Sequence, residues 1–143
     1  MPEGMPPTVL VVDDDPDFVA FVATALEENG YTVVPAYDGV EALEIARRTP
    51  PDLVTLDLQM PRKTGVLFYR QFKADARLSS IPVVIVTGLR NTNSYAAPFV
   101  DAFFEFNDPA ISRPDAFLDK PFASEALLSI VKAKLAAAAE RRP

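Results

Sequence analysis

The chain has 143 residues, enough for about one domain with a substantial buried core, and 49% of them are hydrophobic, as in ordinary globular proteins. Its formal net charge of −6 argues against nucleic acid as the main partner, because phosphate binding requires clustered Lys and Arg. The absence of cysteine and histidine excludes disulfides and thiolate or imidazole metal ligands, so a bound metal would need oxygen ligands, which favour hard cations such as Mg²⁺.

Short apolar runs rich in valine are the candidate strands. In chain order they cover residues 8–12, 32–36, 52–56, 81–86 and 116–119. Uniformly apolar runs of this length are typical of strands that are covered on both faces, as in a parallel sheet.

Helical patterns lie between these runs. They cover residues 16–29, 39–48, 65–75 and 124–140. In the first, Phe18, Phe21, Val22, Ala25 and Leu26 recur at helical spacing and form one apolar stripe. Strands that alternate with helices indicate right-handed βαβ units, and we therefore expect an α/β fold with a doubly wound sheet.

The first strand runs directly into three consecutive aspartates, Asp13, Asp14 and Asp15. Neighbouring carboxylates repel one another, and each raises the pKa of the others unless a cation or hydrogen bonds compensate. One aspartate has a structural explanation, because Asp15 before Pro16 suits the N-cap of the following helix. Three aspartates exceed that need, so the cluster remains a candidate cation site.

Further polar residues follow the other candidate strands. Asp57 ends the third run, Thr87 follows the fourth and Lys120 follows the fifth. In open α/β sheets, ligands bind beyond the carboxyl ends of the strands. We therefore expect these residues and the aspartate cluster to meet at one edge of the sheet, although each alone would be an ordinary turn, cap or surface residue.

Four motifs in this order give the chain its resemblance to a known family. They are "VVDDDPD", "LDLQMP", "VTG" and "FLDKPF". Together they resemble the receiver domain of bacterial two-component response regulators, over about residues 7–138. The resemblance implies a flavodoxin-like fold, a five-stranded parallel sheet of order 2-1-3-4-5, with flexible termini at 1–6 and 139–143.

The resemblance also implies the roles of the acids. Asp57 would be the phospho-acceptor, and Asp13 and Asp14 the acid pair that holds Mg²⁺, for which Mn²⁺ could substitute. Asp57 and the backbone carbonyl of Gln59 would complete the protein ligands. Such a cation would offset the repulsion among the carboxylates. It would therefore explain why three aspartates follow the first strand when a helix cap needs only one.

Three more residues receive roles from the resemblance. Thr87 would be the switch hydroxyl, Lys120 the lysine that meets the phosphoryl oxygens, and Phe117 the aromatic switch residue. Attack by a carboxylate on a phosphoryl group requires that the charge on the equatorial oxygens be met by cations and donors. No general base is required for an ionised carboxylate, so the lack of histidine is no objection.

The implied partners are a sensor histidine kinase or a phosphotransfer protein. A second copy or a downstream protein would bind through the segment from the fourth helix to the last helix, and neither nucleic acid nor a membrane is expected. The chain would not be an enzyme for an external substrate but a receiver that catalyses its own phosphorylation and dephosphorylation. Whether it acts alone or belongs to a longer protein stays open.

The segment between Thr87 and Lys120 departs from the family because it is longer than a receiver normally has. We expect an extended loop and then a helix from Pro98 to about Phe106. Two interpretations stay open for the aromatic residues there. In the first, these aromatic residues would cover the sheet edge as additional core. In the second, Tyr95 and Phe104 would form an exposed patch that a partner recognises.

Other functions remain as alternatives. An aspartyl-phosphate phosphatase of the haloacid dehalogenase type would use Asp13 and Asp15, but no later acidic pair completes its metal site. A flavodoxin-like FMN binder lacks the phosphate-binding loop after the first strand. A pseudo-receiver would have the same fold and never be phosphorylated.

The sequence also favours a cytoplasmic location. No apolar run approaches the roughly 20 residues that a bilayer span needs. The N-terminal "MPEGMPP" has neither the basic nor the hydrophobic region of a secretory signal.

Overall fold

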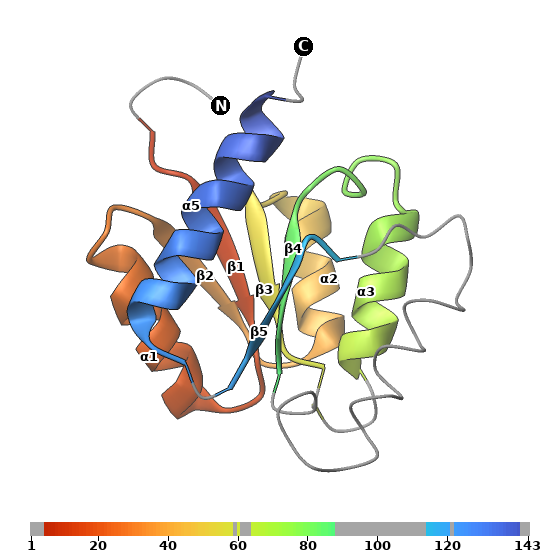
Figure 1. Cartoon of the computed structure of the whole chain (residues 1–143). Helices are drawn as coiled ribbons and strands as arrows, with labels where there is room; N and C mark the ends of the chain where they lie inside the picture. The colour runs from red at the N-terminus through yellow and green to blue at the C-terminus, as the bar shows by residue number, and fades with distance from the viewer. Residues whose placement is uncertain (1–4, 59, 61–63, 88–113, 121, 141–143) are drawn as a thin grey trace.

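The computed structural model describes residues 5–58, 60, 64–87, 114–120 and 122–140 (Figure 1). Its elements are β1 (Thr8–Val12), α1 (Pro16–Glu27), β2 (Thr32–Ala36), α2 (Gly39–Arg48), β3 (Leu53–Leu56), α3 (Thr64–Ala74), β4 (Val83–Thr87), β5 (Ala116–Asp119) and α5 (Ser124–Glu140). These bounds confirm the predicted elements to within a few residues. The predicted helix from Pro98 to Phe106 and the extended segment around it lie outside the described residues.

The strands form one parallel sheet in the order β2-β1-β3-β4-β5, as predicted. In its register, Val12 at the end of β1 pairs with Ala36 at the end of β2 and with Leu56 at the end of β3. The carboxyl ends of these three strands are therefore level. Helices α1 and α5 cover one face of the sheet, and α2 and α3 cover the other (Figure 1).

Each face of the sheet has its own buried core, as β1 illustrates. Val9 and Val11 pack into the cluster beneath α1 and α5, whereas Leu10 and Val12 pack into the cluster beneath α2 and α3. All four side chains are at most 1% exposed. This explains the uniformly apolar sequence of the strand, because successive side chains point to opposite faces and both faces are covered.

Helix α1 begins as the sequence predicts. The side chain of Asp15 accepts a hydrogen bond from the Asp17 backbone N–H, and Pro16 occupies the first helical turn. The helix ends at Glu27, and Gly30 follows with φ +89°, a conformation that L side chains rarely adopt. The length of α1 is thus set by a cap at one end and a glycine turn at the other.

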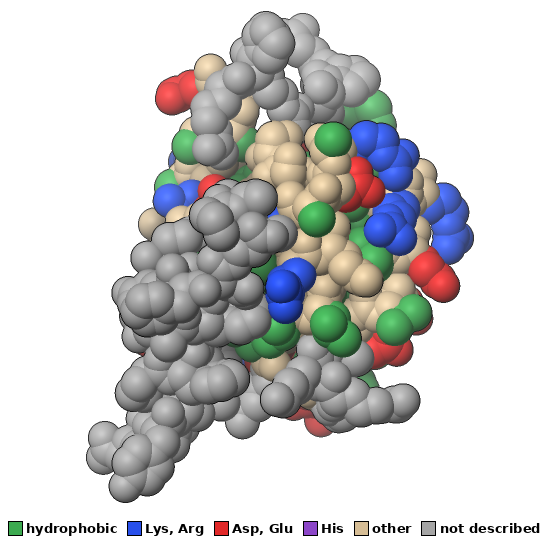
Figure 2. Space-filling view, turned by 90° about the vertical axis from the view of Figure 1, so that its right-hand side faces the viewer, with side chains coloured by type: hydrophobic (Ala, Val, Ile, Leu, Met, Phe, Trp, Pro, Cys, Tyr) green, Lys and Arg blue, Asp and Glu red, His purple; other side chains and the backbone are tan. Residues whose placement is uncertain are grey.

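On the face shown in Figure 2, Lys and Arg side chains gather toward one edge, with Asp and Glu side chains among them. In the part of the chain that the structure describes, no helix combines the length and apolar character needed to cross a bilayer.

Candidate functional site

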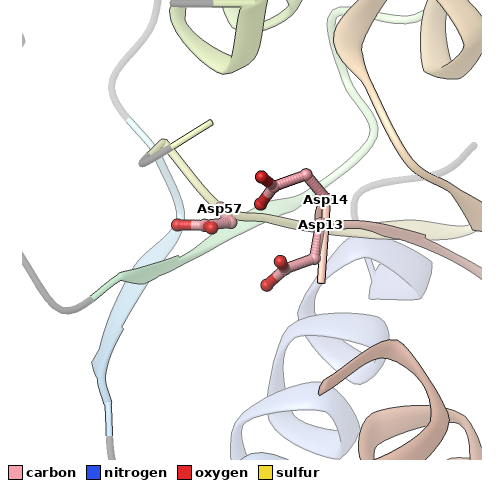
Figure 3. Close-up of side chains that lie close together, drawn as sticks. All are labelled: Asp13, Asp14 and Asp57. Atoms are coloured by element: carbon pink, nitrogen blue, oxygen red, sulfur yellow. The ribbon is translucent and has the colours of Figure 1, made fainter. Parts of the chain in front are cut away.

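Three aspartates meet at the carboxyl ends of β1 and β3. Asp13 and Asp14 follow β1, and Asp57 follows β3. One carboxylate oxygen from each lies within 4.8 Å of the others, and the three side chains lie together beyond the strand ends (Figure 3). Asp13 and Asp57 are 2% and 3% exposed, whereas Asp14 is exposed to solvent. Two buried carboxylates and one exposed carboxylate therefore share a small space.

The sheet itself fixes the two buried aspartates. The backbone N–H of Asp57 donates to the carbonyl of Val12, and that of Asp13 donates to the carbonyl of Ala36, both at 3.0 Å. These bonds continue the ladder of parallel hydrogen bonds by one residue beyond the strands. The sheet therefore fixes the backbone positions of both aspartates.

Asp15 has a different role from its two neighbours. Its side chain caps α1, and its backbone N–H donates to Asp13 Oδ1 at 3.0 Å. The cap confirms the structural explanation predicted for one of the three aspartates. Asp15 is not part of the close carboxylate group, which argues against the phosphatase alternative that pairs Asp13 with Asp15.

Lys120 brings a positive charge to this group from the loop after β5. Its Nζ donates to Asp13 Oδ2 at 3.0 Å and lies 3.6 Å from Asp57 Oδ2. Its side chain is 26% exposed. A single ammonium thus offsets part of the repulsion between two buried carboxylates that lie 44 residues apart in sequence, at positions 13 and 57.

The structure describes the other predicted site residues only in part. Thr87 is the last residue of β4 and pairs with Asp119, and nothing is described of its side chain. Phe117 is half-buried in β5, pairs with Ile85 and packs against the core beneath α2 and α3. Gln59, Tyr95 and Phe104 lie outside the described residues.

The donor set fits a small hard cation. All three groups offer carboxylate oxygens, which are the ligands that Mg²⁺ prefers, and Mg²⁺ usually retains several waters. The exposed side chain of Asp14 leaves the group open to solvent, as such a hydrated ion requires. Among the described residues, this is the group of acidic side chains that could hold a metal.

Gly65, at the start of α3, is a site residue that the sequence interpretation missed. A Cβ atom on Gly65 would lie 2.5 Å from the carbonyl oxygen of Asp57 and 3.1 Å from Leu58 Cα. Only a residue without a side chain lets α3 approach the backbone of Asp57 this closely. The glycine itself was a signal, because it stands where an apolar helical pattern begins.

The fold and the site together define a class: a doubly wound α/β domain with an acidic, lysine-paired site that could bind a metal at the carboxyl ends of its strands. Residues 9–132 match the family model of the response regulator receiver domain. The chain belongs to this family and is a receiver domain of two-component response regulators.

The chain is also similar in sequence to other proteins over most of its length. The "DNA-binding dual master transcriptional regulator RpaA" of Synechocystis is 34% identical over 129 residues, which are 90% of this chain and 49% of RpaA. Protein Rrf1 of Nitratidesulfovibrio vulgaris is 31% identical over 141 residues, which are 97% of this chain and 90% of Rrf1. The chain thus spans about half the length of RpaA and nearly all of Rrf1. The expectation that this chain avoids nucleic acid stays a prediction.

A solved structure is also similar. The signal receiver domain of a signal transduction histidine kinase from Syntrophus aciditrophicus superimposes with a TM-score of 0.79 and 27% sequence identity. The match covers 96% of this chain and 95% of that chain. It agrees with the strand order and the doubly wound topology described above.

Proposed function

We propose that this receiver domain takes a phosphoryl group from a sensor histidine kinase or a phosphotransfer protein onto Asp57, with Mg²⁺ as cofactor. The observation that supports this most is the position of Asp57. It is a buried carboxylate at a strand end, close to the Asp13 and Asp14 carboxylates and 3.6 Å from the Lys120 ammonium. These are the cationic and acidic groups that phosphoryl transfer to a carboxylate requires.

The hydrogen bonds of Asp13 favour a role in metal ligation. Asp13 Oδ1 accepts from the Asp15 backbone N–H and Asp13 Oδ2 accepts from Lys120, both at 3.0 Å. Each bond stabilises the charge on an Asp13 oxygen and so lowers its nucleophilicity. Asp14 is exposed to water, which solvates its carboxylate and so also lowers its nucleophilicity. Asp13 and Asp14 thus suit metal ligation better than attack.

The metal would be held by Asp13, Asp14 and Asp57, with the carbonyl of Gln59 as a further ligand, and Mn²⁺ would substitute for Mg²⁺. When bound, it neutralises charge on the phosphoryl oxygens. The Lys120 ammonium supplies a second positive charge beside the Asp57 carboxylate. Thr87, at the end of the neighbouring strand β4, would move toward the phosphoryl group and donate its hydroxyl hydrogen to a phosphoryl oxygen. Phe117 would respond to this movement of Thr87.

Because all these groups belong to the chain, the domain would catalyse its own phosphorylation from a small phosphodonor and its own dephosphorylation. The phosphorylated state would change the contacts made by the surface around β5 and α5, with a downstream protein or a second copy. The signalling itself would take place in the cytoplasm.

The test is phosphorylation by acetyl phosphate with Mg²⁺, measured by intact mass. The wild-type chain is expected to gain one phosphoryl group that is stable in acid and labile in base. Asp57→Asn is expected to remove it. Asp15→Asn is the matched control, because asparagine also caps helices and Asp15 lies outside the metal group.

Two outcomes would contradict the proposal. Labelling that persists in Asp57→Asn and disappears in Asp13→Asn would favour the phosphatase alternative. No labelling of the wild-type chain and no binding of beryllofluoride with Mg²⁺ would make it a pseudo-receiver.

A further inference from the structure

The face of an aromatic ring lies against the ammonium of Lys120. Lys120 Nζ is 4.0 Å from the centroid of the Phe18 ring. The same nitrogen contacts Asp13 at 3.0 Å and lies 3.6 Å from Asp57. The face of a phenyl ring carries partial negative charge and attracts a cation within about 6 Å of its centroid. The ammonium therefore has an aromatic contact in addition to its two carboxylates.

An aromatic residue close to Lys120 in sequence packs against Phe18. Phe18 lies in the first turn of α1, is half-buried and packs against the core beneath α1 and α5. The Phe122 ring, two residues after Lys120, meets the Phe18 ring edge-on, with centroids 5.8 Å apart and an interplanar angle of 87°. Edge-to-face geometry is favourable for aromatic pairs. These two rings thus join the start of α1 to the loop between β5 and α5. The beginnings of α1 and α5 lie near each other in Figure 1.

A lysine at this position needs such support. Its ammonium is a compact charge on a flexible four-carbon stem, and ordering that stem costs conformational entropy. The carboxylate contacts of Lys120 must also change when a metal binds to Asp13 or a phosphoryl group is added to Asp57. The Phe18 ring is neutral and takes part in neither event, so its contact can persist through both.

We propose that Phe18 is a positioning residue for Lys120: the face of its ring holds the lysine ammonium beside Asp13 and Asp57, in the place where a phosphoryl oxygen must be met. This rests on the proposed phosphorylation of Asp57. Phe18 touches neither the phosphoryl group nor the metal, and it acts only through Lys120.

The kinetic test compares two phenylalanines of the same helix. Phe18→Leu removes the aromatic face and keeps an apolar side chain, whereas Phe21→Leu makes the same change one turn later. Phe21 contacts Phe18 and Phe122, each with centroids 6.0 Å apart, and is 43% exposed. With acetyl phosphate and saturating Mg²⁺, Phe18→Leu should slow phosphorylation of Asp57 roughly 3- to 30-fold, the range that cation–π contacts correspond to. Phe21→Leu should stay near the wild-type rate, and Phe18→Tyr should recover most of it.

A second measurement reports on the lysine directly and needs neither metal nor phosphodonor. The ring current of Phe18 should shift the NMR signals of the Lys120 ε-methylene protons upfield, and the signals are assigned by their loss in Lys120→Arg. Phe18→Leu should return them to the values of a solvated lysine, and Phe21→Leu should leave them shifted. Urea unfolding establishes that each variant is folded, with Phe18→Met as the replacement should Phe18→Leu not fold.

The outcomes separate the two proposals. A Phe18→Leu variant with the wild-type rate, or with unchanged Lys120 signals, would overturn the positioning role while Asp57 remains the acceptor. A slowed rate in Phe21→Leu equal to that in Phe18→Leu would also overturn it, because the effect would then come from the aromatic packing in general. If the wild-type chain takes up no phosphoryl group, the proposed function fails, and the Lys120 signals alone decide whether Phe18 holds the lysine.

Discussion

Lys73 and Asp115 form a nearly buried ion pair between the end of α3 and the start of β5, with Nζ and Oδ2 3.8 Å apart. The Lys73 side chain is 3% exposed, and its ammonium also donates to the carbonyls of Ser79 and Ile81 at 3.1 and 2.8 Å. Asp115 in turn accepts from the backbone N–H of Val83 at 2.9 Å. The pair thus connects α3, β4 and β5 at the amino ends of the strands, opposite the aspartate site.

Removing the charge of Lys73 should destabilise the fold. Lys73→Met would leave two carbonyls and a partly buried carboxylate without the ammonium, which is expected to cost about 3 kcal/mol of the free energy of unfolding. Urea unfolding without Mg²⁺ measures this cost. Lys132→Met, at an exposed position of α5, is the matched control and should change the stability little. Equal losses in the two variants would show that the contacts of Lys73 contribute nothing specific.

Gly65→Ala should damage both the stability and the site. The added Cβ would lie 2.5 Å from the Asp57 carbonyl oxygen, so the backbone of Asp57 or the start of α3 must move. Overpacking of this kind typically costs about 1–3 kcal/mol. Displacement of a reacting group by an ångström can slow a reaction about 100-fold, so phosphorylation by acetyl phosphate should slow at least about tenfold.

Gly30 provides the control for that substitution. It has φ +89°, and a Cβ atom added there would meet no other atom within 4 Å. Asparagine tolerates such a backbone better than other residues with a side chain. Gly30→Asn should therefore keep the wild-type phosphorylation rate. A wild-type rate in Gly65→Ala would mean that α3 can withdraw without moving Asp57.

Asp14→Asn should have opposite effects with and without Mg²⁺. Without the metal, it removes one of three neighbouring carboxylates and relieves their repulsion, so the melting temperature should rise or stay unchanged. With Mg²⁺, the wild-type chain should gain stability, about 2.7 kcal/mol at 100 times the dissociation constant. Asp14→Asn should gain less at the same Mg²⁺ concentration.

Thermal unfolding over a Mg²⁺ titration checks this prediction. Asp17→Asn, which changes an exposed aspartate in the first turn of α1, should respond to Mg²⁺ like the wild-type chain. Asp13→Ala/Asp14→Ala together should abolish the response. A double variant that still titrates with wild-type affinity would exclude this group as the metal site.

Lys120→Met should destabilise the metal-free protein, and Mg²⁺ should restore part of the loss. The ammonium donates to the buried Asp13 carboxylate, and hydrogen bonds to charged groups are worth about 1.5–3 kcal/mol. Because both cations act on the same carboxylates, each should matter more when the other is absent. Urea unfolding of the wild-type chain and of Lys120→Met, each with and without Mg²⁺, measures the coupling between the two cations. An equal gain in stability from Mg²⁺ in both proteins would contradict it.

The sequence predicted the sheet and the acids because both depend on local patterns. Val9 to Val12 are apolar since both faces of β1 are covered, and Asp13 and Asp57 end strands whose carboxyl ends are level. The sequence did not predict the roles of Gly65 or Phe18. Those depend on how closely α3 approaches the Asp57 backbone and on which ring of α1 meets the loop after β5.

The Lys73–Asp115 pair was missed for the same reason, because its partners are 42 positions apart and neither belongs to a recognisable motif. Local periodicity carries no information on such contacts. The interpretation of Tyr95 and Phe104 stays a prediction, as does the ligation by Gln59, since all three lie outside the described residues.

The two cores, one on each face of the sheet, restrict how the lengths of its strands can change. Asp13 stands an even number of residues after Val9 and Val11, and Asp57 stands likewise after Leu53, and these three apolar residues all face α1 and α5. Inserting one residue within β1 would exchange the two faces and turn Asp13 away from Asp57 and Lys120, whereas inserting two would restore every side chain to its face. Strands that carry this site can therefore lengthen or shorten only in even steps, whereas the loops that connect the strands to the helices are under no such restriction.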